Sequence, residues 1–232
     1  MGARQVFIRF AGCNLACQYC DTPESRQSKP DSCVVQDRPG QSICRTIANP
    51  LDVQAVVSVV SGLESATPGH HSVSVTGGEP LIQTPFLLEL CPELRKSGRR
   101  IYLESNGTLV GAMEDLLPHV DIVAMDFKLE SATGVPAETE MHREFLAAVA
   151  EKDVFVKVVV DESTPENEIQ ECAAVIALIN RRIPLVIQPA TPIDASASTV
   201  TASQLLLLQC AAANLLEDVR VIPQCHKLLG LR

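Results

Sequence analysis

Short runs of apolar residues recur along the chain, and stretches with helical periodicity separate them. Most of these runs are apolar at consecutive positions rather than at alternate ones, a pattern typical of parallel strands that are buried on both faces. The strands predicted in this way cover residues 6–10, 72–76, 100–104, 121–127, 154–160, 184–188 and 219–222.

Helical patterns fill the intervals, and three of them begin near a polar residue followed by proline. Asn49, Thr84 and Thr164 each precede a proline, which favours a capping side chain with proline at the first helical position. The predicted helices cover residues 51–63, 86–96, 138–152, 166–180 and 203–216. Strands that alternate with helices of this length indicate an α/β fold with a parallel sheet, either open or curled toward a barrel.

The composition limits the classes of protein to which the chain can belong. Of its 232 residues, 46% are hydrophobic, which is enough for one substantial core. The formal net charge of −9 argues against nucleic acid as a partner. No apolar run reaches the roughly 18 residues of a membrane span, so we expect no membrane association and a cytoplasmic protein. We predict a single domain over residues 1–232, with the Ser-, Pro- and Gln-rich stretch 23–50 as an irregular insertion loop.

Three of the nine cysteines, Cys13, Cys17 and Cys20, follow the first predicted strand in the spacing C-x3-C-x2-C. In a chain without a recognisable secretion signal, clustered cysteines favour metal ligation over disulfides. Three thiolates in one loop suit an iron–sulfur cluster with one iron open to a small molecule, because a [4Fe–4S] cluster normally takes four thiolates. A structural zinc site, with Cys33 or Cys44 as the fourth ligand, is the alternative.

Polar residues also follow the next three predicted strands. The segment 76–80 (TGGEP) contains two glycines that permit close backbone approach and a carboxylate that suits an ammonium group. The segments 104–107 (ESNG) and 126–128 (DFK) follow the third and fourth strands. Each segment alone predicts only a turn or solvated side chains. Because the carboxyl ends of parallel strands share one edge of a sheet, together they predict a ligand site beside the cysteines.

The cysteine loop and the Gly-Gly-Glu-Pro segment resemble the radical S-adenosylmethionine (SAM) superfamily. Phe-x-Arg-Phe-x-Gly-Cys at 7–13, Cys-Asp-Thr at 20–22 and Pro-Gln-Cys-His-Lys-Leu-Leu-Gly at 223–230 narrow this to a resemblance to the 7-carboxy-7-deazaguanine synthase family. The resemblance implies a partial TIM-type barrel of parallel strands with outer helices. It also implies a carbon–nitrogen lyase that converts 6-carboxy-5,6,7,8-tetrahydropterin to 7-carboxy-7-deazaguanine with loss of ammonia, for queuosine- or archaeosine-type deazapurines.

The same resemblance implies cofactors, partners and residue roles. The cofactors would be a [4Fe–4S] cluster, SAM and Mg²⁺, with a pterin substrate, an external one-electron reductant of the flavodoxin or ferredoxin type, and a homodimeric assembly. The implied ligands are Cys13, Cys17 and Cys20 for the cluster and Thr22 for Mg²⁺. The implied SAM contacts are Tyr19, Asp21, Gly78, Glu79, Glu104, Ser105, Asn106, Asp126, Phe127 and Lys128. The implied substrate contacts are Arg9, Thr76, His226 and Arg232.

One departure and two alternatives accompany this resemblance. Family members usually carry a further strand and a Gln-Gly-Glu-Gly loop before the first strand, and this sequence does not contain that segment. A radical SAM activase that generates a glycyl radical on a partner protein shares the cysteine loop but has no need of Thr22 or His226. A non-enzymatic iron–sulfur or zinc protein leaves the Gly-Gly-Glu-Pro segment unexplained.

Overall fold

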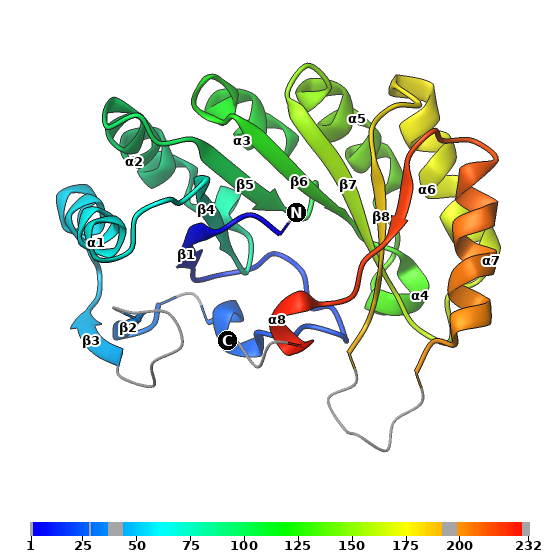
Figure 1. The fold of residues 1–232 in the computed structure, drawn as a ribbon, viewed down its shortest axis with the longest axis horizontal. Coiled ribbons are helices and arrows are strands. Elements are labelled where there is room, and N and C mark those ends of the chain that lie inside the picture. Colours follow the sequence, from blue (N-terminus) through cyan, green and yellow to red (C-terminus); the bar gives the residue numbers. More distant parts are fainter. Residues whose placement is uncertain (1, 28, 37–43, 192–198, 229–232) are drawn as a thin grey trace. The chain divides into compact units, whose positions relative to one another are not determined.

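The computed structural model describes residues 2–27, 29–36, 44–191 and 199–228. The chain folds into two compact units. The first comprises Met1–Asn14, Thr22–Glu104 and Glu114–Ile122, and the second comprises Leu15–Asp21, Ser105–Met113 and Val123–Arg232. In both units, strands alternate with helices along the chain (Figure 1).

The first unit is built on three strands in the order β1 (Gln5–Phe10), β4 (Ser72–Gly77) and β5 (Ile101–Ser105). Both pairs are parallel, and β1 and β4 run in register from Gln5 beside Ser72 to Phe10 beside Gly77. Helix α1 (Val53–Ala66) packs against α2 (Thr84–Lys96). The buried face of α2 is a helical stripe at positions 87, 90, 91 and 94, which explains why this segment forms an amphipathic helix. The short elements of this unit are η2 (Pro80–Gln83) and η3 (Leu117–His119). Helix α3 (Val110–Leu116) has its residues 110–113 in the second unit and 114–116 in the first.

The segment 23–50 contains regular structure, so its prediction as an irregular loop is wrong for part of its length. It begins with η1 (Pro23–Arg26) and continues into an antiparallel hairpin of β2 (Ser32–Gln36) and β3 (Cys44–Ala48). Each strand has five residues and only one or two apolar positions in alternation, too few to stand out in the sequence.

The second unit contains β6 (Ile122–Phe127), β7 (Asp153–Val160), β8 (Leu185–Pro189) and β9 (Val219–Val221), in that order. The pairs β7–β8 and β8–β9 are parallel. Helices α5 (Thr139–Val149), α6 (Glu166–Ile179) and α7 (Ala202–Ala213) pack in succession beside these strands (Figure 1). The remaining helices, α4 (Glu130–Thr133) and α8 (Cys225–Leu228), are single turns.

The seven predicted strands are confirmed within one residue at each end, and the five predicted helices within three. The predicted caps are wrong. Asp52, not Asn49, caps α1 by accepting a hydrogen bond from the backbone N of Ala55 at 2.8 Å. Thr84 lies inside α2, and the hydroxyl of Thr164 binds within its own turn rather than at the start of α6. Of the helices in the described ranges, none has the length and apolar character that a membrane span requires.

Candidate functional site

In the first unit, the turn after β4 packs directly against the start of the cysteine loop. The backbone N of Gly78 donates to the O of Phe10 at 3.2 Å, and the N of Glu79 donates to the O of Gly12 at 2.8 Å. A Cβ at Gly78 would lie 2.2 Å from the O of Gly12 and 2.9 Å from the Cβ of Cys13. Only glycine permits this approach. The second glycine of the TGGEP segment therefore fixes the backbone from which the first cysteine projects.

The carboxylate of Glu79 is fully buried. Its Oε1 accepts a hydrogen bond from the backbone N of Leu81 at 3.1 Å, which caps η2. One carboxylate oxygen therefore has a structural partner within the turn, and the contact of this side chain with an ammonium group stays a prediction.

The residues after the cysteines return to the same turn of the first unit. The N of Gly12 donates to the O of Ser25 at 2.7 Å. The buried hydroxyl of Ser25 donates to the backbone O of Thr22 at 2.6 Å and lies 3.3 Å from its Oγ1. Because a hydroxyl oxygen has two lone pairs, the contact with Ser25 leaves Thr22 with acceptor capacity for a second partner.

Three further predicted site residues lie together at the ends of β1, β4 and β5. Arg9 is the register neighbour of Thr76, and its Nη1 donates to the O of Gly77 at 3.4 Å. The buried hydroxyl of Thr76 donates to Oε2 of Glu104 at 3.1 Å. Arg9 is exposed, so its remaining guanidinium donors face solvent. The structure thus places a cation, a hydroxyl and a carboxylate on adjacent strands.

The second unit contains a network of charged side chains beside the cysteine loop. Nζ of Lys128 donates to Oδ2 of Asp126 at 2.8 Å and to the hydroxyl of Tyr19 at 2.9 Å. Nζ of Lys157 lies 3.1 Å from the same oxygen of Asp126. Two ammonium groups therefore share one carboxylate, which leaves an excess of positive charge around Tyr19.

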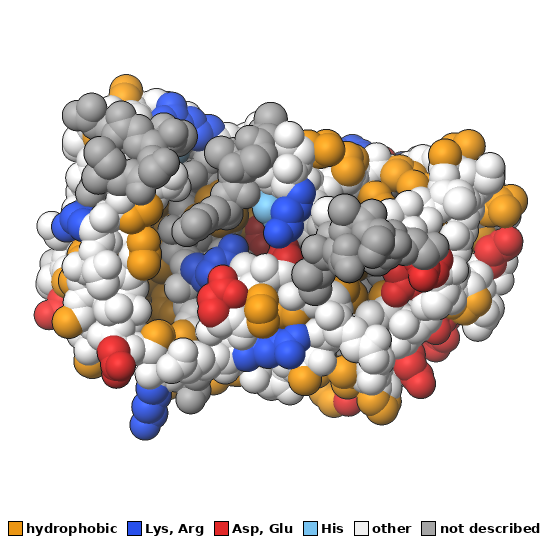
Figure 2. All heavy atoms as spheres, turned by 90° about the horizontal axis from the view of Figure 1, so that it is seen from below, with side chains coloured by type: hydrophobic (Ala, Val, Ile, Leu, Met, Phe, Trp, Pro, Cys, Tyr) orange, Lys and Arg blue, Asp and Glu red, His pale blue; other side chains and the backbone are white. Residues whose placement is uncertain are grey.

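Burial and charge set the protonation states in this network. Burial raises the pKa of Asp126, but Lys128 and Lys157 outweigh that effect and hold the pKa below its usual value. Burial lowers the pKa of Lys128, and the carboxylate of Asp126 reverses this, so the pKa lies well above its usual value. Burial and then the charge of Asp126 raise the pKa of Tyr19. At neutral pH, Asp126 is therefore an anion, Lys128 a cation and Tyr19 a neutral phenol. Acidic and basic side chains are also interspersed on the face seen in Figure 2.

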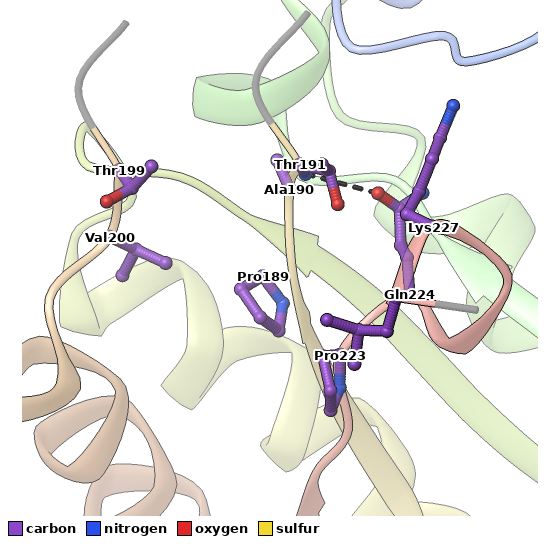
Figure 3. A pocket seen from close by; sticks show the side chains of 9 residues that line it. Pro189, Ala190, Thr191, Thr199, Val200, Pro223, Gln224 and Lys227 are labelled. Carbon is purple, nitrogen blue, oxygen red and sulfur yellow. Dashed lines mark hydrogen bonds between the residues drawn. The ribbon is translucent and has the colours of Figure 1, made fainter. Parts of the chain in front are cut away.

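Asp21 and His226, predicted from motifs at opposite ends of the sequence, lie together in the second unit. Nε2 of His226 is 3.3 Å from Oδ2 of Asp21, and Nε2 of Gln224 donates to the same oxygen at 3.2 Å. Oε1 of Gln224 accepts from the backbone N of Thr191 at 3.1 Å (Figure 3). Gln224 and Thr191 also line a cavity of about 320 Å³, whose apolar wall includes Pro189 (Figure 3). The segment after β9 is thus tied to the residue that follows the last cysteine.

The turn after β5 uses its predicted site residues internally. Oγ of Ser105 accepts from the N of Gly107 at 3.2 Å, and Oδ1 of Asn106 accepts from the N of Thr108 at 3.1 Å. The side chains of Ser105, Asn106 and Phe127 are buried. Their contact with a cofactor stays a prediction.

The three cysteines of the motif lie in irregular backbone between β1 and η1. Cys17 is buried, whereas Cys13 and Cys20 are half-buried. Three sulfur donors suit an iron–sulfur cluster by their chemistry. Within the described residues, no group of three His, Cys, Asp or Glu side chains is arranged to hold a metal ion, so the cluster ligands stay a prediction.

Other cysteines do not form a second site in the hairpin. Cys33 pairs with Ile47 and Cys44 pairs with Gln36, so the two cysteines project from opposite faces of the hairpin. They cannot serve one metal together.

Two residues with a place in this arrangement were missed from the sequence. Lys157 is the single charged residue among the apolar positions 154–160, and a charge in such a strand signals a buried partner. Gln224 lies in the motif at 223–230, but the sequence indicated no role for it. The predicted substrate residue Arg232 lies outside the described residues.

Comparison with solved structures supports the fold. SuiB of Streptococcus suis, solved with SAM bound, matches with a TM-score of 0.61 at 13% identity over 95% of this chain. The match covers 47% of the SuiB chain, so this chain spans about half the length of that protein. Parallel strands with flanking helices, together with this likeness, confirm an α/β fold of the partial-barrel type.

Comparison of sequences identifies the family. Residues 7–161 match the family model described as the Radical SAM superfamily. The 7-carboxy-7-deazaguanine synthase of Geobacter sulfurreducens is 39% identical over 231 residues, which cover 99% of this chain and 91% of the relative. The protein of that name from Methanothermobacter thermautotrophicus is 34% identical, over 100% of this chain and 92% of the relative. The chain belongs to the radical SAM superfamily and, within it, to the 7-carboxy-7-deazaguanine synthase family.

Proposed function

We propose that this chain is a radical SAM lyase that converts 6-carboxy-5,6,7,8-tetrahydropterin to 7-carboxy-7-deazaguanine with loss of ammonia. The product would enter the synthesis of queuosine- or archaeosine-type deazapurines. The observation that carries the proposal is the 39% identity, over 99% of the chain, to the enzyme of that name from Geobacter sulfurreducens. The cofactors are a [4Fe–4S] cluster and SAM, and an external protein of the flavodoxin or ferredoxin type supplies one electron.

Cys13, Cys17 and Cys20 would hold the cluster through three of its irons. When bound and reduced, the cluster and SAM supply the one-electron chemistry that breaks a C–H bond of the substrate. Gly78 lets the turn after β4 pack tightly against the backbone of Gly12 and against Cys13, which supports a fixed position for the first of these cysteines. The role of the protein is placement, because radical chemistry gains most from reactants held in contact and shielded from water.

The charged network of the second unit supports a site for the amino-acid part of SAM. Lys128 and Lys157 together exceed the charge of Asp126, which favours a carboxylate ligand near Tyr19. Asp21, held by Gln224 and His226, would form a further SAM contact. The proposed SAM residues are Tyr19, Asp21, Gly78, Glu79, Glu104, Ser105, Asn106, Asp126, Phe127 and Lys128.

The proposed substrate contacts supply the groups that a carboxylated pterin requires. The exposed guanidinium of Arg9 suits the carboxylate, because its paired N–H groups match the two oxygens. Thr76, oriented by Glu104, and the imidazole of His226 would bind the ring system. Arg232, outside the described residues, completes the proposed set.

Thr22 would provide a hydroxyl ligand to Mg²⁺, with water and the substrate carboxylate as the other ligands. Ser25 supports this role because it holds both the backbone and the hydroxyl of Thr22. We further propose a single radical SAM domain over residues 1–232, with 23–50 as an insertion, that works as a cytoplasmic homodimer.

The test is anaerobic reconstitution with iron and sulfide, followed by incubation with SAM, dithionite and the carboxytetrahydropterin. We expect 7-carboxy-7-deazaguanine and ammonia in equal amounts. Cys17→Ala should lose SAM cleavage, whereas Cys210→Ala, an exposed cysteine of α7, should behave as the parent. A fully loaded parent protein that gives no product rejects the proposal. SAM cleavage without pterin turnover would point to an activase, and absence of SAM binding to a non-enzymatic iron–sulfur protein.

A further inference from the structure

Helix α5 carries a fully buried histidine, His142, that belongs to none of the motifs and none of the proposed contacts. Its Nε2 lies 3.0 Å from the backbone O of Asn106. Its ring lies 4.3 Å from the ring of Phe127, measured between centroids, with the planes tilted by 31°. One side chain of a helix therefore touches two strand-end residues that are proposed to bind SAM.

The chemistry of the contact defines which nitrogen carries the proton. Burial lowers the pKa of His142 to about 4, so the ring is neutral at neutral pH. A carbonyl oxygen can only accept, so Nε2 carries the hydrogen and donates it to Asn106. Nδ1 is then an acceptor, and it is buried without a hydrogen-bond partner among the described residues. A buried acceptor without a partner is costly, so a phenyl ring would serve better here if the side chain only filled space.

The turn after β5 is shaped around this ring. Gly107 has a φ of +71°, and a Cβ there would lie 2.8 Å from Cε of Met125 and 3.1 Å from Cδ2 of His142. On its other side, the turn is closed by the hydrogen bond from Gly107 to Ser105. The imidazole thus limits where the backbone of Asn106 and Gly107 can lie.

We propose that His142 is a positioning residue for SAM, which acts by holding the carbonyl of Asn106 with its N–H and the ring of Phe127 with its face. His142 does not itself contact the cofactor. The proposal rests on the proposed function, because it takes Asn106 and Phe127 as SAM contacts. Loss of the hydrogen bond would let the turn shift relative to Phe127, and SAM would bind a less well ordered site.

Three variants separate this role from general stabilisation. His142→Phe keeps an aromatic ring against Phe127 and removes the donor. His142→Gln keeps an N–H donor near the position of Nε2 and removes the ring. Phe145→Leu alters a fully buried residue one turn further along the same helix and serves as the control for lost stability.

Each variant is reconstituted, and its iron content, melting temperature and SAM dissociation constant by equilibrium dialysis are measured. The change in the electron paramagnetic resonance signal of the reduced cluster on SAM addition gives a second view of binding. Amide hydrogen exchange of Gly107 and Thr108 is followed in the protein without cluster. For His142→Phe we expect full iron content, faster exchange in the turn and a SAM dissociation constant raised about tenfold. His142→Gln should recover part of that loss, and Phe145→Leu should melt earlier with SAM affinity within about twofold of the parent.

Unchanged SAM affinity in His142→Phe overturns the proposal. A loss of affinity that follows the melting temperature across all three variants overturns it as well, because the role would then be general stability. If His142→Phe does not load its cluster, the SAM affinity of His142→Gln and the amide hydrogen exchange of Gly107 and Thr108 decide whether the proposal holds. A loaded parent that does not bind SAM refutes the proposed function and this inference together. If the parent binds SAM and His142→Phe binds it equally well, the inference alone is refuted.

Discussion

Replacing Gly78 with alanine tests whether the turn after β4 holds the start of the cysteine loop. The new Cβ would lie 2.2 Å from the O of Gly12, whereas real Cβ atoms essentially never approach a neighbour within 3.0 Å. The obstacle is backbone, and it cannot rotate away as a flexible side chain could. The backbone at Gly12 must therefore retreat by roughly 0.8 Å, which stretches the 2.8 Å hydrogen bond from the N of Glu79.

The magnitude follows from two effects. Overpacking of a tight contact costs about 1–3 kcal/mol. Loss of the hydrogen bond between Glu79 and Gly12 adds about 1 kcal/mol. We therefore expect Gly78→Ala to lower the free energy of unfolding by about 2–4 kcal/mol. The matched change is Gly62→Ala in α1, where a Cβ meets no atom within 4 Å. There, the better helix propensity of alanine should raise stability by about 0.5–1 kcal/mol.

Urea unfolding followed by circular dichroism compares the two variants, and iron and sulfide analysis after reconstitution shows whether the cysteine loop still assembles its cluster. Gly62→Ala should load as the parent, whereas Gly78→Ala should load less and lose it faster. Two variants that unfold within about 0.5 kcal/mol of each other would refute the reasoning. Full loading with parent-like SAM affinity in Gly78→Ala would show that the close approach does not matter for the site.

Three further predictions concern single interactions. Lys157→Met removes one of the two ammonium groups on Asp126 and should lower the free energy of unfolding by about 1–2 kcal/mol at neutral pH, measured in urea; an unchanged value would contradict the shared pairing. Thr76→Val removes the hydrogen bond to Glu104 and should cost about 1 kcal/mol in the same assay, and a loss below about 0.3 kcal/mol would speak against that bond. Burial lowers the pKa of His142 from its usual 6.5 to about 4, so the unfolded chain binds this proton first, and stability falls as pH drops through that window. As the pH falls from 6.5 to 4, the free energy of unfolding of His142→Phe should therefore rise by about 3 kcal/mol relative to that of the parent. A difference between the two proteins that does not change with pH would refute the lowered pKa of His142.

The strands were predictable because burial on both faces leaves a signal in consecutive residues. In β6, the four consecutive positions 122–125 are all apolar and all buried, so the residue types there reflect burial on both faces of the strand. Helix caps carry no comparable signal. Asn49 and Asp52 are both good capping residues, and which of them caps α1 depends on the path of the preceding chain. The hairpin of β2 and β3 was not predicted, because its short strands have too few alternating apolar positions to be distinguished from a loop in the sequence.

Site residues were predictable where the chemistry is carried by neighbours in the chain. Asp126 and Lys128 are two positions apart at the end of a strand, and their side chains project to the same side and pair at 2.8 Å. The pairing of Asp21 with His226 could not be derived in this way. More than two hundred positions separate them in sequence, and only the order of the strands brings the segment after β9 to the cysteine loop.

For Lys157, the sequence predicts that a partner of opposite charge exists but does not identify it. A single ammonium group in the strand 154–160 is unfavourable without an anion, so the strand alone predicts a buried carboxylate nearby. It does not say which one, because any acidic residue on an adjacent strand satisfies the requirement. The fold selects Asp126, which already pairs with Lys128, and the selection changes the chemistry. A carboxylate with one lysine would be a neutral pair, whereas a carboxylate with two leaves a positive charge beside Tyr19. The surplus positive charge of this network therefore comes from a residue outside every motif.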